Sequence, residues 1–163
     1  MNLNIPKARI ARRNAGFFKR LLAFAIDFFI LDLIVFTYFQ KIFYQYFPEN
    51  ITASELITFI QNSDLSGLYI ALFFMAILSL AYFSFFEYKL GQTPGMMLLK
   101  LKVISTESKK KLGFWKIVLR NIYVFPYFPF SILWVVEPLM IIFKRERILE
   151  LMTKTKTVEE VLV

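Results

Sequence analysis

The sequence predicts an all-α integral membrane protein with two full transmembrane helices, a third hydrophobic stretch broken by prolines, and room for a small β pairing on the cytoplasmic side. The 163-residue chain is 58% hydrophobic and 18% aromatic, which is more apolar material than a soluble domain of this size can bury. Two apolar runs, 17–47 and 68–88, each reach the roughly 20 residues that cross a hydrocarbon core of about 30 Å. Pro126 and Pro129 interrupt a third run, 114–143.

A single membrane domain, 1–163, accounts for every segment of the chain. The first apolar run is too long and too acidic for a cleaved signal peptide, so we expect it to persist as a helix. In chain order we expect a basic cytoplasmic tail (1–15), the first transmembrane helix (17–47), an external loop (48–67), the second transmembrane helix (68–88), a basic cytoplasmic loop (89–113), the third hydrophobic stretch (114–143) and a cytoplasmic tail (144–163).

The distribution of basic residues predicts the orientation. The formal charge is +8, and residues 1–20 hold six basic residues and no acid. Residues 89–113 are basic as well, whereas the loop 48–67 contains acids and no Lys or Arg. By the positive-inside rule the N-terminus is cytoplasmic in a multi-pass protein of the cell membrane. The lipid bilayer and its anionic headgroups explain the positive charge without nucleic acid as a partner.

Local patterns predict smaller elements outside the two long helices. In the external loop, Thr52 and Glu55 form a capping box before apolar residues, which is typical of a short amphipathic helix at the membrane surface. Residues 100–105 and 153–158 alternate with period two. These two stretches can pair as strands, and an unstructured C-terminal tail is the alternative.

The third hydrophobic stretch allows two topologies. A helical hairpin, with arms 114–125 and 127–143, returns the chain to the cytoplasm, whereas a single third span puts the tail outside. The tail 144–163 contains five basic residues, which favours the hairpin. A broken backbone at membrane depth must be covered by protein, so we expect the break to pack on the first two helices.

Two sequence blocks resemble the signatures of the RDD family of small multi-pass membrane proteins. GFFKRLLAFAID (16–27) is similar to the first signature, with the family arginine at Arg20 and its first aspartate at Asp27. GQTPGMMLLKLKVIS (91–105) resembles the second signature and contains the motif residues Gly91, Gln92, Thr93, Pro94 and Gly95. Arg120 and Asn121 match a basic residue and an asparagine that commonly follow, and Glu150 stands where the second aspartate is expected.

The spacing of the buried charges predicts a partner for Asp27. Arg20 and Asp27 are two helical turns apart, about 10 Å along the axis, so they share a face without touching. Arg20 is expected to reach lipid phosphates, and Ala23 between them would let another helix approach closely. Arg120 and Asn121 are the expected partners of Asp27, in a structural anchor. A cation or proton site at Asp27 is the alternative.

Further acids predict a polar cleft. Asp32 lies about 140° around the helix from Asp27, so the two carboxylates do not form one site, and Asp32 is expected near the bilayer middle. Glu137 is expected to face Arg120. With Asp27, Asp32 and Glu87 it would also line a net negative cleft suited to a cation. Four aromatic residues are typical of an interface belt: Tyr82, Tyr88, Trp115 and Trp134.

Transport, of monovalent cations or protons, is the function we expect. The family resemblance implies a multi-pass fold and a role in transport, and three or four helices make so narrow a pathway that a homo-oligomer is expected. A scaffold or accessory protein that binds lipid or partner proteins through its basic cytoplasmic face is the alternative. The chain has no cysteine and no histidine, which removes thiolate sites and His-based catalysis. We expect no enzyme, no cofactor and no metal site.

Overall fold

The computed structural model describes residues 10–46, 64–107 and 112–162. The amphipathic helix expected in the external loop lies outside these residues. The elements are β1 (Ile10–Asn14), α1 (Phe17–Leu31), a π-helical segment (Asp32–Phe36), α2 (Thr37–Tyr46), α4 (Ser66–Leu90), α5 (Pro94–Leu98), β2 (Leu101–Ser105), α6 (Phe114–Arg120), short 3-10 turns (Ile122–Val124 and Phe130–Ile132), α7 (Leu133–Lys144), α8 (Ile148–Thr153) and β3 (Thr155–Leu162).

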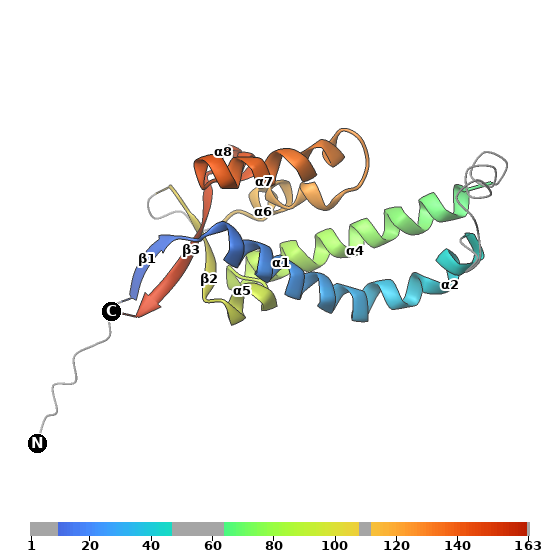
Figure 1. Ribbon diagram of the computed structural model, residues 1–163, viewed down its shortest axis with the longest axis horizontal. Helices are drawn as coiled ribbons and strands as arrows, with labels where there is room; N and C mark the ends of the chain where they lie inside the picture. The colour runs from blue at the N-terminus through green and yellow to red at the C-terminus, as the bar shows by residue number, and fades with distance from the viewer. Residues whose placement is uncertain (1–9, 47–63, 108–111, 163) are drawn as a thin grey trace, which may run out of the picture.

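Two long helices form the body of the molecule and lie side by side (Figure 1). α1, the π-helical segment and α2 form one helix with a 29-residue apolar span, Phe17–Gln45, and α4 contributes 25 residues, Ser66–Leu90. By length and composition both helices can cross a membrane. Large apolar side chains point outward along them, with Phe18 82% and Phe29 62% exposed. A mostly helical chain with two such helices fits a membrane protein.

A three-stranded sheet covers one end of the helices, where the sequence predicted at most a two-stranded pairing. The strand order is β1-β3-β2 and both pairings are antiparallel. The expected pairing of 100–105 with 153–158 is present as β2 and β3, with Val103 opposite Thr157. β1 adds to the free edge of β3, within residues that were expected to form a tail. An unpaired edge of the eight-residue β3 would leave its backbone groups unsatisfied, and β1 covers that edge.

The third hydrophobic stretch folds back instead of forming one long helix. α6 ends at Arg120, the chain turns through a region that contains Pro126 and Pro129, and α7 returns toward the sheet (Figure 1). α7 has 12 residues, or about 18 Å of helix, which is shorter than the ~30 Å hydrocarbon core. The first arm, α6 with the 3-10 turn Ile122–Val124, nearly matches the expected 114–125, whereas the α-helix of the second arm begins at Leu133 and not near 127.

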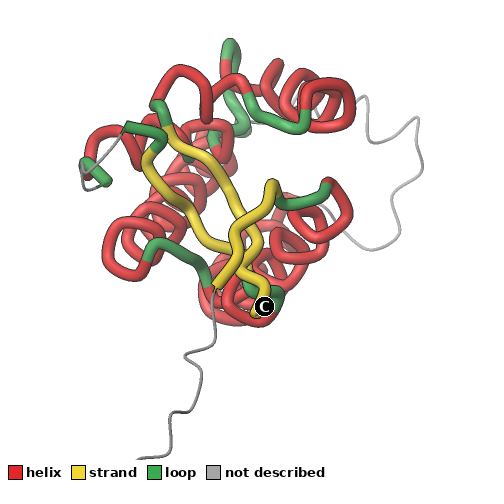
Figure 2. The backbone as a smooth tube through the Cα atoms, turned by 90° about the vertical axis from the view of Figure 1, so that its left-hand side faces the viewer, coloured by secondary structure: helices red, strands yellow, loops and turns green. Residues whose placement is uncertain are grey.

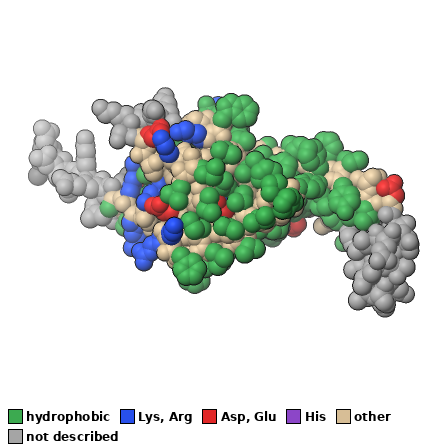
Figure 3. Space-filling model, turned by 90° about the horizontal axis from the view of Figure 1, so that it is seen from above, with side chains coloured by type: hydrophobic (Ala, Val, Ile, Leu, Met, Phe, Trp, Pro, Cys, Tyr) green, Lys and Arg blue, Asp and Glu red, His purple; other side chains and the backbone are tan. Residues whose placement is uncertain are grey.

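The sheet brings distant parts of the chain to the same end of the molecule. Figure 2 views this end, with the strands crossing in front of the helices. Lys and Arg side chains gather there, whereas hydrophobic side chains cover much of the surface over the helices and the hairpin (Figure 3). Residues 10–14, 101–105 and 155–162 therefore lie at one end of the molecule.

Candidate functional site

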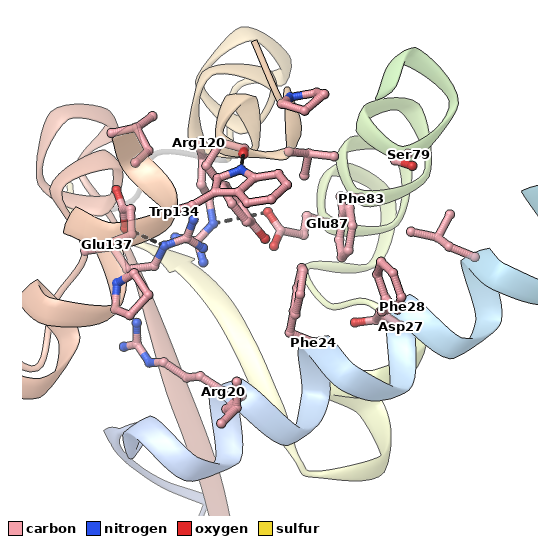
Figure 4. Close-up of a pocket in the computed structure, with 18 of the residues that line it drawn as sticks. Arg20, Phe24, Asp27, Phe28, Ser79, Phe83, Glu87, Arg120, Trp134 and Glu137 are labelled. Carbon is pink, nitrogen blue, oxygen red and sulfur yellow. Dashed lines mark hydrogen bonds and ion pairs between the residues drawn. The ribbon is translucent and has the colours of Figure 1, made fainter. Parts of the chain in front are cut away.

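A cavity of about 570 Å³ lies between α1, α4 and the hairpin. Most of its wall is apolar, and Phe24 and Phe28 of α1 lie across it from Trp134 (Figure 4). Six charged residues also line it: Arg20, Asp27, Glu87, Arg120, Glu137 and Arg147. The site is thus an apolar cavity with charged groups on its wall.

Asp27 does not pair with Arg120, contrary to the sequence prediction. Its carboxylate accepts a hydrogen bond from the Tyr82 hydroxyl at 3.0 Å, from the Gly95 backbone N–H at 2.8 Å and from the Thr93 hydroxyl. Asp27 is 1% exposed. These contacts join α1 to α5 and α4 through neutral donors. Tyr82 faces this carboxylate instead of serving only in an aromatic belt.

The GQTPG motif is built around this contact. Thr93 is the N-cap of α5 and accepts a hydrogen bond from the Met96 N–H at 3.3 Å, and Pro94 stands in the first turn. A Cβ at Gly95 would lie 2.2 Å from the Ala23 carbonyl oxygen, so only glycine permits this approach of α5 to α1. Ala23 thus has the close neighbour expected for a small residue. Gly91 ends α4 with a φ of 73°, and Gln92 is half-buried.

Arg120 is the centre of a buried network behind the cavity. Its side chain is fully buried, and Nε donates to Glu87 Oε2 at 3.1 Å. Nη1 donates to Glu150 Oε1 at 3.1 Å and to Thr155 Oγ1 at 3.0 Å, and Nη2 donates to Thr157 Oγ1 at 2.7 Å. The neighbouring residue, Asn121, donates from Nδ2 to the same Glu87 oxygen at 3.0 Å. All three guanidinium nitrogens of Arg120 are therefore engaged.

Glu150 connects this network to the first helix. Its Oε2 accepts a hydrogen bond from Arg20 Nη1 at 2.9 Å, and Nη2 of Arg20 donates to the Thr157 carbonyl at 3.2 Å. The expectation that Arg20 reaches lipid phosphates is wrong, because its side chain is 8% exposed and bonded within the protein. Burial alone would raise the pKa of the Glu150 carboxyl, but the charges of Arg120 and Arg20 outweigh burial and lower that pKa to about 2.

Glu137 pairs with Arg147, so the prediction that Glu137 faces Arg120 is wrong. Arg147 Nε donates to Glu137 Oε2 at 2.7 Å, and the Leu149 backbone N–H donates to Glu137 Oε1 at 2.9 Å. The Arg147 guanidinium also stacks 4.2 Å from the centre of the Tyr123 ring. This pair holds α7 against the start of α8.

The cavity is balanced in charge, which corrects the expected net negative cleft. Its three arginines face three acids. Asp32 does not line the cavity: it is partly exposed at the start of the π-helical segment. Within the described ranges no group of three or more acids could hold a metal ion.

Sequence reasoning missed Arg147 and Thr157, whereas Thr155 stands where the family resemblance places a threonine after Glu150. Thr155 and Thr157 alternate along β3, and that period places both on the face that meets Arg120. Arg147 precedes Glu150 by three residues, and the Glu150 carboxylate accepts a hydrogen bond from the Arg147 backbone N–H at 3.2 Å. This N-cap spacing was a readable signal for the start of α8.

Comparison with known proteins agrees with the sequence resemblance. No curated protein and no solved structure matches the chain. The model of the RDD family matches residues 14–150, which cover Arg20, Asp27, the GQTPG block and Glu150. That range spans far more than half of the 163 residues, and so this chain belongs to the RDD family.

Proposed function

We propose that this RDD family member takes part in transport across the cell membrane, that protons or monovalent cations are the species moved, and that its N-terminus is cytoplasmic. The observation that carries the proposal is that Asp27 has no positively charged partner among the described residues. Among the described residues, every other acid below 10% exposure has an arginine or lysine within ion-pair distance: Glu87, Glu137, Glu150 and Glu159. Asp27 has only neutral donors.

An uncompensated carboxylate inside an apolar helix is a site where a proton or a small cation is stabilised. Asp27 lies on the cavity wall, so such a species reaches it from the cavity. When Asp27 takes a proton, its carboxyl becomes a donor, and either Thr93 or Tyr82 must reorient its hydroxyl. Thr93 caps α5, which leads directly to β2, so the binding event is transmitted to the sheet.

The experiment is ion-driven proton movement in vesicles reconstituted with purified protein. A pH-sensitive dye inside the vesicles reports proton flux when a Na⁺ or K⁺ gradient is imposed. We expect flux with the unchanged chain, loss of flux with Asp27→Asn, and retained flux with the control Asp32→Asn, because Asp32 is outside the cavity. Circular dichroism and gel filtration establish that each variant is folded. A folded Asp27→Asn protein with full flux would refute the role of Asp27.

A second candidate function is that of a scaffold that binds anionic lipid or partner proteins. The Lys and Arg side chains at the sheet end support it (Figure 3). Absence of flux in the unchanged protein favours this candidate. Lys89→Gln and Lys100→Gln, at two exposed sites, would then reduce the amount of anionic lipid that co-purifies with the protein. Under either function we expect a homo-oligomer, which mass photometry measures.

A further inference from the structure

We propose that the cavity holds one acyl chain of an anionic phospholipid from the surrounding bilayer, with the lipid phosphate bound by Arg147. This site goes beyond the proposed ion transport and does not require it. The lipid occupies the same cavity that leads to Asp27, so a bound acyl chain and an ion on its way to Asp27 exclude each other. The occupant follows from three features of the described residues: the dimensions of the cavity, its apolar wall, and the donors that Arg147 has to spare.

The cavity has the dimensions of a lipid chain. Its volume of about 570 Å³ is within the ~300–1,000 Å³ typical of ligand pockets. Along α4 its wall runs from Leu72 to Glu87, which is about 22 Å of helix and more than the ~15 Å that one leaflet contributes to the hydrocarbon core. The part of the wall farther from the sheet is apolar, with Leu72, Met75 and Leu31. An acyl chain fits this wall, because it needs no polar partner.

Of the three cavity arginines, Arg147 has the most N–H donors left for a phosphate. All three guanidinium nitrogens of Arg20 and of Arg120 donate hydrogen bonds within the protein. Within the described part of the chain, Glu137 is the one carboxylate paired with the Arg147 guanidinium, and it contacts Nε. The guanidinium also bonds the Tyr123 side chain, and the remaining Nη hydrogens are the donors for a contact with phosphate.

The position of Arg147 matches the geometry of a lipid. It precedes α8 at the sheet end, while the apolar wall extends away from the sheet along α4. A phospholipid with its phosphate at the sheet end and its chain along α4 has the orientation of a cytoplasmic-leaflet lipid in the proposed topology. Glu137 competes with the phosphate for the same guanidinium, so the two residues should affect binding in opposite directions.

The test is photo-labelling of the purified protein by phosphatidylglycerol that has a diazirine in its acyl chain, with mass spectrometry as the readout. We expect labelling of cavity residues such as Ala76 and Leu133. Arg147→Gln should weaken labelling at least about tenfold, which corresponds to ~1.4 kcal/mol. Glu137→Gln should strengthen it, because the carboxylate that competes for Arg147 is removed. The control Arg145→Gln, at an exposed site two residues away, should leave labelling unchanged.

The double variant Glu137→Gln with Arg147→Gln leaves neither charge unpaired, so it keeps the test valid if Arg147→Gln does not fold. We expect this variant to be folded and weakly labelled. Equal losses in both single variants would overturn the proposal, because they would indicate a structural pair. Equal labelling by phosphatidylcholine would also overturn the proposal. Loss of labelling when a helix of a second copy fills the cavity would overturn it too. Labelling needs no ion gradient, so loss of labelling with intact flux rejects only the lipid site, and labelling without flux rejects only the transport function.

Discussion

Arg20 and Glu150 are separated by 130 residues and meet in a buried ion pair of 2.9 Å. The pair ties the first helix to α8, and the other carboxylate oxygen of Glu150 accepts from Arg120 of α6. One acid thus holds three elements together beneath the sheet. Because the resemblance places an aspartate of the RDD family at position 150, this relationship gives that position a structural role.

Glu150→Gln should destabilise the protein by about 3–5 kcal/mol, since two buried arginines would lose their shared counter-charge. Denaturant unfolding in detergent micelles measures the change. Glu146→Gln is the matched control, because Glu146 pairs with Lys156 at a half-exposed site and should cost less than about 1 kcal/mol. Equal losses in the two variants would contradict a central role for Glu150.

Stability should fall on acidification through the protonation of Glu150. Its pKa in the folded protein is about 2, below the 4.5 of the unfolded chain, so its contribution is complete above pH 4.5 and is lost as the pH falls toward 2. The shift corresponds to about 3 kcal/mol. Free energies of unfolding between pH 6 and pH 2 measure it, and the slope should be flatter in Glu150→Gln. Parallel slopes would exclude Glu150 as the titrating group.

Gly95→Ala should separate α5 from α1. The added Cβ would lie 2.2 Å from the Ala23 carbonyl oxygen, so the helices must move and the Gly95 N–H must leave Asp27. We expect a loss of about 1–3 kcal/mol or more in the free energy of unfolding. Gly113→Ala is the control, because its nearest neighbour is 3.9 Å away. A tolerated Gly95→Ala would contradict the close approach.

Double-mutant cycles should show that Arg120 is coupled to Glu87 and not to Asp27, the partner expected from the sequence. Glu87→Gln and Arg120→Gln remove two sides of one buried ion pair, so their effects on stability should be coupled by about 0.5–3 kcal/mol. Asp27→Asn and Arg120→Gln should be additive within about 0.5 kcal/mol, because Asp27 bonds other groups. Strong coupling between Asp27 and Arg120 would show that the two sites communicate.

Single cysteines should report the topology, since the chain has none of its own. With an impermeant thiol reagent on intact cells, Asp64→Cys should be labelled, whereas Thr106→Cys and Arg145→Cys should be protected. Labelling of Thr106→Cys and Arg145→Cys without labelling of Asp64→Cys would reverse the orientation. Labelling of both Asp64→Cys and Arg145→Cys would mean that the third hydrophobic stretch crosses the membrane.

The sequence by itself determined the helices and strands that depend on neighbouring residues in the chain. The apolar runs predicted the two long helices, Thr93 and Pro94 predicted the start of α5, and the alternation in 100–105 and 153–158 predicted β2 and β3. Each of these signals depends on residues within a few positions of one another, and so it can be read from the chain alone. The two signature blocks likewise identified the family.

Only the tertiary structure decided which charged groups meet. Helical spacing tells which face Asp27 occupies, but not that Gly95 and Tyr82 lie opposite while Arg120 faces Glu87 and Glu150. β1 was missed for the same reason, because its residues form a strand only when β3 lies beside them. Ion pairs and sheet edges join residues that are distant in the chain, and their partners depend on how the helices pack.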